Sequence, residues 1–336
     1  MEHINILYQF NDIYAAFAGV SITSLLENNR DADMISIYIL GEELSQATIQ
    51  RFKSLCKKYS NIQLIFPDVR DKIHCLKELD LPAYRGSYAA NLRMFLDEFV
   101  DVKVDRILYL DADTIVDHSL QDLFDYNLSG NTLGMVLESL ENKEHKVQIG
   151  LEKDSEYFNS GMILYDMHQW RKKGYADRIM EHIKNIRSHY SCPDQDLINI
   201  ICKGDIFRLP LKYNYQPFHR VYSVKLYRKV YQPFPYYSDL EINAGNNKPV
   251  IYHCYRYIGE FPWHKNTLHP FVEEFDKYLA ISPWNDYEKK PSICSLTVQI
   301  EKCLNYILPK SIFLPIFKLA HNTFMHQSEK NLEGKN

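Results

Sequence analysis

The first half of the chain alternates between short apolar runs and segments whose apolar residues recur at helical spacing. The apolar runs predict strands over Ile4–Phe10, Met34–Leu40, Ile62–Phe66 and Arg106–Leu110. The helical spacing predicts a helix after Asn11 or Asp12 and further helices over Ser45–Tyr59 and Asn91–Phe99. Alternating strands and helices are typical of parallel βαβ units. We therefore expect an α/β protein with a mostly parallel central sheet.

The second half is more mixed. We expect strands over Thr132–Glu138, Met162–Tyr165 and Pro249–His253, and helices over His168–Arg187 and Asp194–Lys203. Between Tyr213 and Tyr237 the chain has seven tyrosines and four basic residues without an acid, which suits either a sugar or anion pocket or simple packing. After about Pro283 the composition shifts to apolar patches and lysines. The sequence thus predicts one main domain over residues 1–285 and an appendage over residues 286–336.

Composition excludes several classes of protein. Of the 336 residues 46% are apolar and 24% charged, as in soluble globular chains, and a net charge of −4 argues against a nucleic-acid partner. The seven cysteines contain no CxxC pair, which argues against a disulfide framework or a structural zinc site. Neither a secretory signal nor an apolar run of about 20 residues is evident. We expect a cytoplasmic protein.

A pair of carboxylates follows the fourth predicted strand. Asp111, Ala112 and Asp113 come directly after Leu110, at the strand end where α/β sheets bind ligands. Two carboxylates so close can share Mg²⁺ or Mn²⁺, and such an ion binds substrate phosphates. The pair suits an enzyme that neutralises the diphosphate of a nucleotide sugar.

Two other functions are compatible with part of this pattern. A haloacid-dehalogenase-type phosphatase would use Asp111 as a nucleophile, and Asp111-Ala112-Asp113 matches the DxD part of its DxDxT motif. That motif belongs on the first strand of such a domain, whereas three predicted strands precede it here. A non-catalytic sugar-binding module is the second alternative.

Further motifs accompany the carboxylate pair in a fixed order. They are Asn11–Ala16, Tyr88–Arg93, Tyr157–Gly161, Cys192–Asp196, and His253 followed by Pro262-Trp263-His264. With these motifs, roughly residues 4–285 resemble glycosyltransferase family 8, the retaining enzymes that include glycogenin and bacterial lipopolysaccharide galactosyl- and glucosyltransferases. The resemblance implies a GT-A fold. It also implies transfer of glucose or galactose from a UDP-hexose donor to a saccharide or glycolipid acceptor, such as lipopolysaccharide or a cell-surface polysaccharide.

The resemblance also implies roles for individual residues. Gln195 would lie near the anomeric carbon, and Asp194 and Asn159 would hold the donor sugar. The other donor-binding residues would be Asn11, Asp12, Tyr14, Arg93, Asp111, Ala112, Asp113 and Ser160. Asp111, Asp113 and His253 would bind a metal, with Mn²⁺ favoured over Mg²⁺ by the imidazole nitrogen. Simpler roles remain open, since Asp12 and Asp194 could cap helices and His253 could be an ordinary strand-end histidine.

The chain departs from the family pattern at Phe261. The family usually has a lysine there, before Pro-Trp, which pairs with the diphosphate. We expect Arg256 or Lys265 to supply the missing cation in this chain.

The appendage carries an amphipathic pattern over Ser311–Met325. Its expected apolar side consists of Ile312, Phe313, Ile316, Phe317, Ala320 and Phe324. With Lys310 and Lys318 at its edge, this side predicts a segment that lies on the anionic inner face of a membrane. The alternative is a helix docked on the catalytic domain or on a second copy of the chain.

Overall fold

A computed structural model describes residues 3–79, 81, 83, 87–140, 142–185, 190 and 192–333, with side chains described as far as residue 323. Within these ranges the strands are β1 (His3–Asn11), β2 (Met34–Glu42), β3 (Ile62–Ile65), β4 (Arg106–Leu110), β5 (Thr114–Val116), β6 (Leu133–Leu137), β7 (Phe158–Asp166), β8 (Ile206–Arg208) and β9 (Ile251–His253). The α-helices are α1 (Ala15–Asn28), α2 (Gln46–Lys58), α3 (Arg70–Glu78), α4 (Gln121–Phe124), α5 (Lys143–Gln148), α6 (Met167–Lys173), α7 (Tyr175–Asn185), α8 (Pro193–Ile201), α9 (Pro217–Val221), α10 (Val224–Tyr231), α11 (Asp239–Asn247), α12 (Val272–Leu279), α13 (Leu296–Ile307) and α14 (Lys310–Glu333). Three short 3₁₀ segments are η1 (Asp12–Tyr14), η2 (Ala89–Glu98) and η3 (Leu211–Tyr213).

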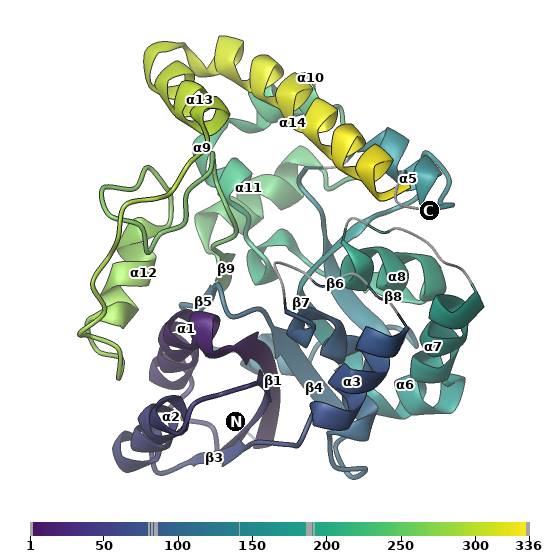
Figure 1. The fold of residues 1–336 in the computed structure, drawn as a ribbon, viewed down its shortest axis with the longest axis vertical. Coiled ribbons are helices and arrows are strands. Elements are labelled where there is room, and N and C mark those ends of the chain that lie inside the picture. The colour runs from purple at the N-terminus through teal and green to yellow at the C-terminus, as the bar shows by residue number, and fades with distance from the viewer. Residues whose placement is uncertain are drawn as a thin grey trace.

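The central sheet is mostly parallel, which confirms the predicted fold class. Its strand order in the described chain is β3-β2-β1-β4-β7-β6-β8, and β7 runs antiparallel to β4 and β6. Helices flank the sheet on both sides (Figure 1), so strand residues such as Ile6 and Leu108 are fully buried. The strand order reverses beside β1 and β4, and open α/β sheets bind ligands at such a point.

A small second sheet, formed by β5 and β9, positions His253. β5 and β9 pair antiparallel, with Thr114 directly opposite His253. The Cys254 N–H donates to the Asp113 carbonyl over 2.7 Å. This pairing carries His253 to the end of β4, although the two segments are far apart in the sequence.

Two predicted helices differ in detail. The predicted helix His168–Arg187 is broken into α6 and α7, because Gly174 adopts a left-handed conformation (φ 61°) and ends α6. The predicted helix Asn91–Phe99 is the 3₁₀ segment η2, which is kinked at Phe95. Its middle is buried on all sides, so η2 lacks the outward face of an amphipathic helix.

The C-terminal helices pack on the end of the molecule that lies opposite β3 (Figure 1). Phe313, Leu314 and Phe317 of α14 are buried in a cluster with residues of α9, α10 and the loop after β9, namely Phe218, Tyr222, Tyr227, Tyr231, Tyr257 and Ile258. Several tyrosines of the basic, Tyr-rich segment therefore serve packing. The expected outward face is corrected: Phe313 and Phe317 point inward, whereas Ile312 and Ile316 are exposed. The side chain of Phe324 lies outside the described residues.

Helix α13 holds the loop that follows His253. Lys302 forms an ion pair with Glu260, whose side chain is only 3% exposed. Val298 lies over Gly259 so closely that a Cβ at Gly259 would sit 2.1 Å from the valine Cγ1. Gly259 also has a left-handed φ of 76°, which favours glycine. We name residues 254–261 the His253 loop.

None of the helices, as far as the chain is described, combines the length and apolar character needed to cross a bilayer.

Candidate functional site

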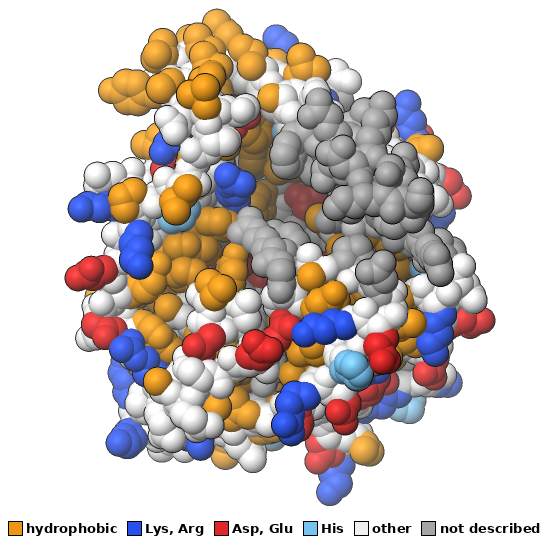
Figure 2. All heavy atoms as spheres, viewed as in Figure 1, with side chains coloured by type: hydrophobic (Ala, Val, Ile, Leu, Met, Phe, Trp, Pro, Cys, Tyr) orange, Lys and Arg blue, Asp and Glu red, His pale blue; other side chains and the backbone are white. Residues whose placement is uncertain are grey.

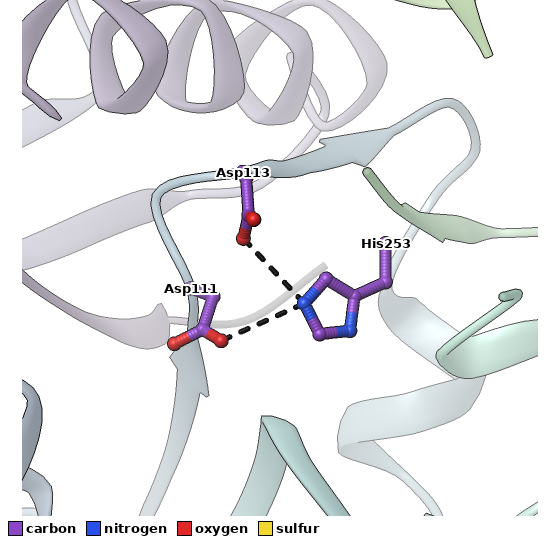
Figure 3. Close-up of side chains that lie close together, drawn as sticks. All are labelled: Asp111, Asp113 and His253. Carbon is purple, nitrogen blue, oxygen red and sulfur yellow. Dashed lines mark ion pairs between the residues drawn. The ribbon is translucent and has the colours of Figure 1, made fainter. Parts of the chain in front are cut away.

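Three predicted metal ligands meet at the end of β4. Asp111 and Asp113 point toward the ring of His253, which projects from β9 (Figure 3). His253 Nε2 lies 3.6 Å from Asp111 Oδ2 and 3.5 Å from Asp113 Oδ1. One ligand atom from each residue lies within 4.8 Å of the others. Two carboxylates and an imidazole form a donor set that suits a divalent cation, and the nitrogen favours Mn²⁺ over Mg²⁺.

The backbone around these ligands leaves little freedom. The Asp111 N–H donates to the Gly161 carbonyl over 2.9 Å, which ties the end of β4 to β7. A Cβ at Gly161 would lie 2.1 Å from Cε1 of the His253 ring. Glycine is therefore required at position 161 for His253 to approach the carboxylates. Ala112, between the two carboxylates, is itself buried.

Arg93 lies behind the carboxylates and is almost fully buried. Its Nη2 donates to Asp111 Oδ1 over 2.9 Å, and its Nη1 lies 3.2 Å from Asp194 Oδ2 and donates to the Ser160 carbonyl over 2.7 Å. The guanidinium also stacks over the Tyr109 ring, 4.1 Å from its centroid. Burial disfavours the cation, but Asp111, Tyr109 and Asp194 outweigh it and raise the pKa of Arg93. Arg93 thus neutralises buried negative charge beside the ligands.

Asp194 does not cap α8, the simpler role that its position allowed. The helix begins after Cys192, with Pro193 in its first turn, and the Asp194 side chain turns toward Arg93 instead. Burial raises the pKa of Asp194, and Arg93 opposes this shift. The sequence did not indicate the contact between Asp194 and Arg93, which comes only from tertiary packing.

Gln195 is held in a fixed orientation. Its Oε1 accepts from the Ser160 N–H over 3.0 Å, and its Nε2 donates to the Tyr157 hydroxyl over 3.2 Å. Tyr157 in turn donates to the fully buried Asp196, which also contacts His145 Nε2 over 2.8 Å. The start of α8 is therefore held against β7, and Asp194 is connected to Asp111 through Arg93.

Asn159 belongs to a hydrogen-bonded chain that the sequence did not reveal. Its Nδ2 donates to Glu138 Oε2 over 2.6 Å, and its Oδ1 accepts from Asn214 Nδ2 over 2.8 Å. Asn214 Oδ1 lies 3.1 Å from His253 Nδ1. Glu138 is the last residue of a predicted strand, and this position at the carboxyl end of the strand could have indicated that it belongs to the site. Asn214 has no comparable signal, because it lies in an irregular segment.

The N-terminal motif lies at the end of β1, and its residues Asn11, Asp12 and Tyr14 have different partners. Asn11 Oδ1 caps η1 by accepting from the Tyr14 N–H over 3.3 Å. Asp12 Oδ1 accepts from the Ser45 N–H over 3.0 Å, so this carboxylate is turned toward α2. Tyr14 lines an open pocket of about 370 Å³ whose other walls are Ile13, Phe17, Phe261, Trp263, His264, Tyr287, Lys290, Pro291 and Ile293. An aromatic wall of this kind suits a flat ligand such as a nucleobase.

Phe261 stands where a lysine was expected, and its side chain packs against a neighbouring ring. Its ring stacks on Trp263 with centroids 4.4 Å apart and planes 8° from parallel. Arg256 is exposed near Gly259, and the Lys265 N–H pairs with the Lys290 carbonyl over 2.9 Å. Among the described residues, neither cation forms an ion pair with Asp111 or Asp113. Lys290, which sequence reasoning did not single out, lines the pocket beside Phe261.

Comparisons with known proteins agree with this geometry. The sequence model of Glycosyl transferase family 8 matches residues 5–267. Lipopolysaccharide 1,2-glucosyltransferase of Escherichia coli K12 is 26% identical over 315 residues, covering 91% of this chain and 86% of that protein. Lipopolysaccharide 1,3-galactosyltransferase of Salmonella typhimurium is 27% identical over 292 residues, covering 84% of this chain and 80% of that protein. The solved galactosyltransferase LgtC superposes with a TM-score of 0.66 at 22% identity, covering 83% of this chain and 96% of that one, and this likeness confirms the GT-A fold.

Proposed function

The chain belongs to glycosyltransferase family 8, and from that premise we propose that it moves glucose or galactose from a UDP-sugar to a saccharide acceptor with retention of the anomeric configuration. The observation that carries the proposal is the cluster of Asp111, Asp113 and His253 at the switch point of the sheet. The related lipopolysaccharide glucosyl- and galactosyltransferases support a hexose as the transferred group and lipopolysaccharide or another cell-surface glycan as the acceptor.

The metal ligands fit the proposed chemistry. A Mn²⁺ or Mg²⁺ ion bound there would stabilise the negative charge of the departing diphosphate. Asp111, Asp113 and His253 would hold that ion, while Arg93 neutralises the Asp111 and Asp194 carboxylates behind it. In this arrangement Asp111 keeps its ligand oxygen Oδ2 on the side of His253, because Oδ1 is taken by Arg93.

Gln195 and its neighbours would hold the donor sugar. We propose that Gln195 lies at the anomeric carbon, since its side chain is fixed by the Ser160 N–H and the Tyr157 hydroxyl. Asp194 and Asn159 would contact sugar hydroxyls, and departure and attack would occur on the same face of the sugar. Asn11, Asp12 and Tyr14 would bind the uridine, with the pocket beside Tyr14 receiving the base. Ala112 and Ser160 would complete the donor site.

The donor screen is the first experiment. The purified protein is incubated with UDP-glucose, UDP-galactose and other UDP-sugars, with Mn²⁺, with Mg²⁺ and with EDTA. We expect metal-dependent release of UDP from one hexose donor, and retention in the sugar product by NMR. Binding without hydrolysis or transfer would favour a sugar-binding module. A covalent phosphate on Asp111 would favour the phosphatase.

The cation that replaces the family's lysine is a separate part of the proposal. We propose that Arg256 or Lys265 contacts the diphosphate once the donor is bound. Alanine at the correct position should weaken UDP-sugar binding by about 1.5–3 kcal/mol, the strength of a charge-assisted hydrogen bond. Lys290→Ala is the informative comparison, because Lys290 lines the pocket beside Phe261. If only Lys290→Ala weakens UDP-sugar binding, the cation that contacts the diphosphate is Lys290 of the appendage.

We also propose that the protein acts at the cytoplasmic face of a membrane, where a glycolipid acceptor is held. Large apolar side chains remain exposed on and near α13 and α14, and they are Ile293, Leu296, Ile300, Tyr306, Ile307, Ile312, Ile316 and Leu319. Figure 2 shows apolar side chains gathered over α13 and the beginning of α14. Residues 291–325 hold three lysines and one acid, which suits an anionic lipid surface.

Cosedimentation with vesicles tests the membrane contact. The full chain should bind vesicles that contain anionic lipid, and binding should fall as salt rises because the charges are screened over about 8–10 Å. Ile316→Ser with Leu319→Ser should weaken binding, since both side chains are exposed. The alternative outcome is a chain that does not bind vesicles but forms concentration-dependent dimers, which the two substitutions abolish. The exposed face would then be an interface with a second copy of the chain.

A further inference from the structure

A hydrogen-bonded relay leads from a carboxylate to the back of the metal-ligand histidine. Glu138 Oε2 and Asn159 Nδ2 are 2.6 Å apart, Asn159 Oδ1 and Asn214 Nδ2 are 2.8 Å apart, and Asn214 Oδ1 and His253 Nδ1 are 3.1 Å apart. Its three inner members are almost fully removed from water, with Asn159 6%, Asn214 0% and His253 4% exposed. A wrongly oriented amide here would leave buried groups unpaired, which costs about 1–3 kcal/mol.

The ends of the relay determine the orientation of every group in it. A carboxylate only accepts hydrogen bonds, so Asn159 must turn its NH₂ group toward Glu138. The Gly161 N–H, which can only donate, points at the other atom, Asn159 Oδ1, over 3.0 Å. These two contacts fix the Asn159 amide independently of each other. Its Oδ1 then requires the NH₂ group of Asn214, and the Asn214 oxygen is left facing His253.

The tautomer of His253 follows from this orientation. An amide oxygen accepts a hydrogen bond, so Nδ1 of His253 must carry the hydrogen. The lone pair of the neutral ring is then on Nε2, which faces Asp111 and Asp113. Only this tautomer presents a ligand atom to a cation held by the two carboxylates. Hydrogen-bond partners of this kind orient metal-binding histidines in many proteins.

We propose that Glu138, Asn159 and Asn214 are positioning residues that hold His253 in the Nδ1–H tautomer, with Nε2 presented to the divalent cation. This inference rests on the proposed function for the identity of the ion, but the tautomer itself is a property of the metal-free protein. It gives Asn159 a second task besides contact with the donor sugar. It also explains why Glu138 lies at the end of β6 without touching any of the three ligands.

The first measurement is the ¹⁵N NMR spectrum of the His253 ring in the metal-free protein at alkaline pH, where the imidazole is neutral. We expect a protonated Nδ1 and an unprotonated Nε2 in the wild type, and a mixture of tautomers in Asn214→Leu. An Nε2–H tautomer in the wild type would overturn the proposal, whatever the protein's activity.

The second measurement is the Mn²⁺ affinity. It is monitored through the EPR signal of free Mn²⁺, with and without UDP. Asn214→Leu and Glu138→Leu should weaken Mn²⁺ binding about 10–100-fold, the usual effect of removing a partner of a metal ligand. Glu138→Gln keeps one accepting oxygen for Asn159, at the expense of the bond that Glu138 Oε1 accepts from the Leu140 N–H, and should change the affinity less than Glu138→Leu. The Leu and Gln variants at this position thus form a matched pair.

Asn199→Leu is the control for general destabilisation. Asn199 is also a buried amide that bonds to β7, through the N–H and carbonyl of Phe158, but it does not contact His253. If Asn199→Leu and Asn214→Leu lower Mn²⁺ affinity equally, the relay has only a structural role and the proposal is wrong. A wild type that shows the expected tautomer but binds no Mn²⁺ would instead contradict the metal site of the proposed function.

Discussion

The local sequence pattern predicts where side chains lie at the metal-ligand cluster, but it does not do so in the C-terminal helices. At the cluster, a buried strand ends directly in Asp111, and the local pattern already indicates which side chains reach the ligand edge. In α14, apolar side chains occur around the whole helix. Leu314 is fully buried, whereas Leu319, five residues later, is 71% exposed. A strand end therefore fixes the position of its functional groups locally, whereas an apolar helix needs a partner before its inward face is defined.

The two regions are also connected. The His253 loop leaves the metal-ligand cluster and ends under α13, where Lys302 pairs with Glu260. Tyr257 and Ile258 of the same loop pack with α14. The comparison thus predicts which changes remove chemistry alone, which remove stability alone, and which affect both.

The largest expected effect is a pure loss of chemistry. Asp111→Asn and Asp113→Asn each remove a negative ligand while keeping the shape of the side chain. We expect turnover to fall by orders of magnitude and the fold, followed by circular dichroism, to survive. Asp154→Asn, at an exposed position, is the control and should leave turnover unchanged. Metal-dependent turnover that persists in both ligand variants would refute the metal site.

The next largest effect should join the two regions. A chain that stops after Asn285 loses Phe313, Leu314 and Phe317, which cover aromatic residues of α9, α10 and the His253 loop. It also leaves the buried Glu260 without Lys302. We expect a lower melting temperature together with loss of UDP-sugar hydrolysis. A shortened chain with the wild-type melting temperature and hydrolysis would show that the helices are independent of the site.

A matched pair of leucines separates the two faces of α14. Leu314→Ala should lower the free energy of unfolding by about 2–5 kcal/mol, because it opens a cavity in a buried cluster. Leu319→Ala should change it by less than about 0.5 kcal/mol, because its side chain is exposed. Urea unfolding measures both. Equal effects at the two positions would mean that α14 packs by a different face.

A smaller effect than that of Leu314→Ala is expected at the link between α13 and the His253 loop. Lys302→Met keeps much of the side-chain length but removes the ion pair, and among the residues that the structure describes it leaves the Glu260 carboxylate with the Leu268 N–H and the Thr267 hydroxyl. We expect a loss of about 1–3 kcal/mol in the free energy of unfolding. KM for the donor should rise more than kcat falls, and Lys302→Arg should restore both. A change in stability without a change in KM would limit Lys302 to a structural role.

The sequence by itself determined the α/β class, the strand Arg106–Leu110 and the place of Asp111 and Asp113 at its end. These features depend on a short continuous apolar run and on the residues that directly follow it, and both are written in consecutive residues. The family resemblance named His253 as a third ligand, but only the tertiary structure decided that β5 pairs with β9 and in this way brings His253 to those carboxylates. It also decided that Arg93 meets Asp194, that Glu138 and Asn214 stand behind His253, and which face of α14 is buried. Such pairings depend on how distant segments pack, and no local pattern of polar and apolar residues specifies the partner.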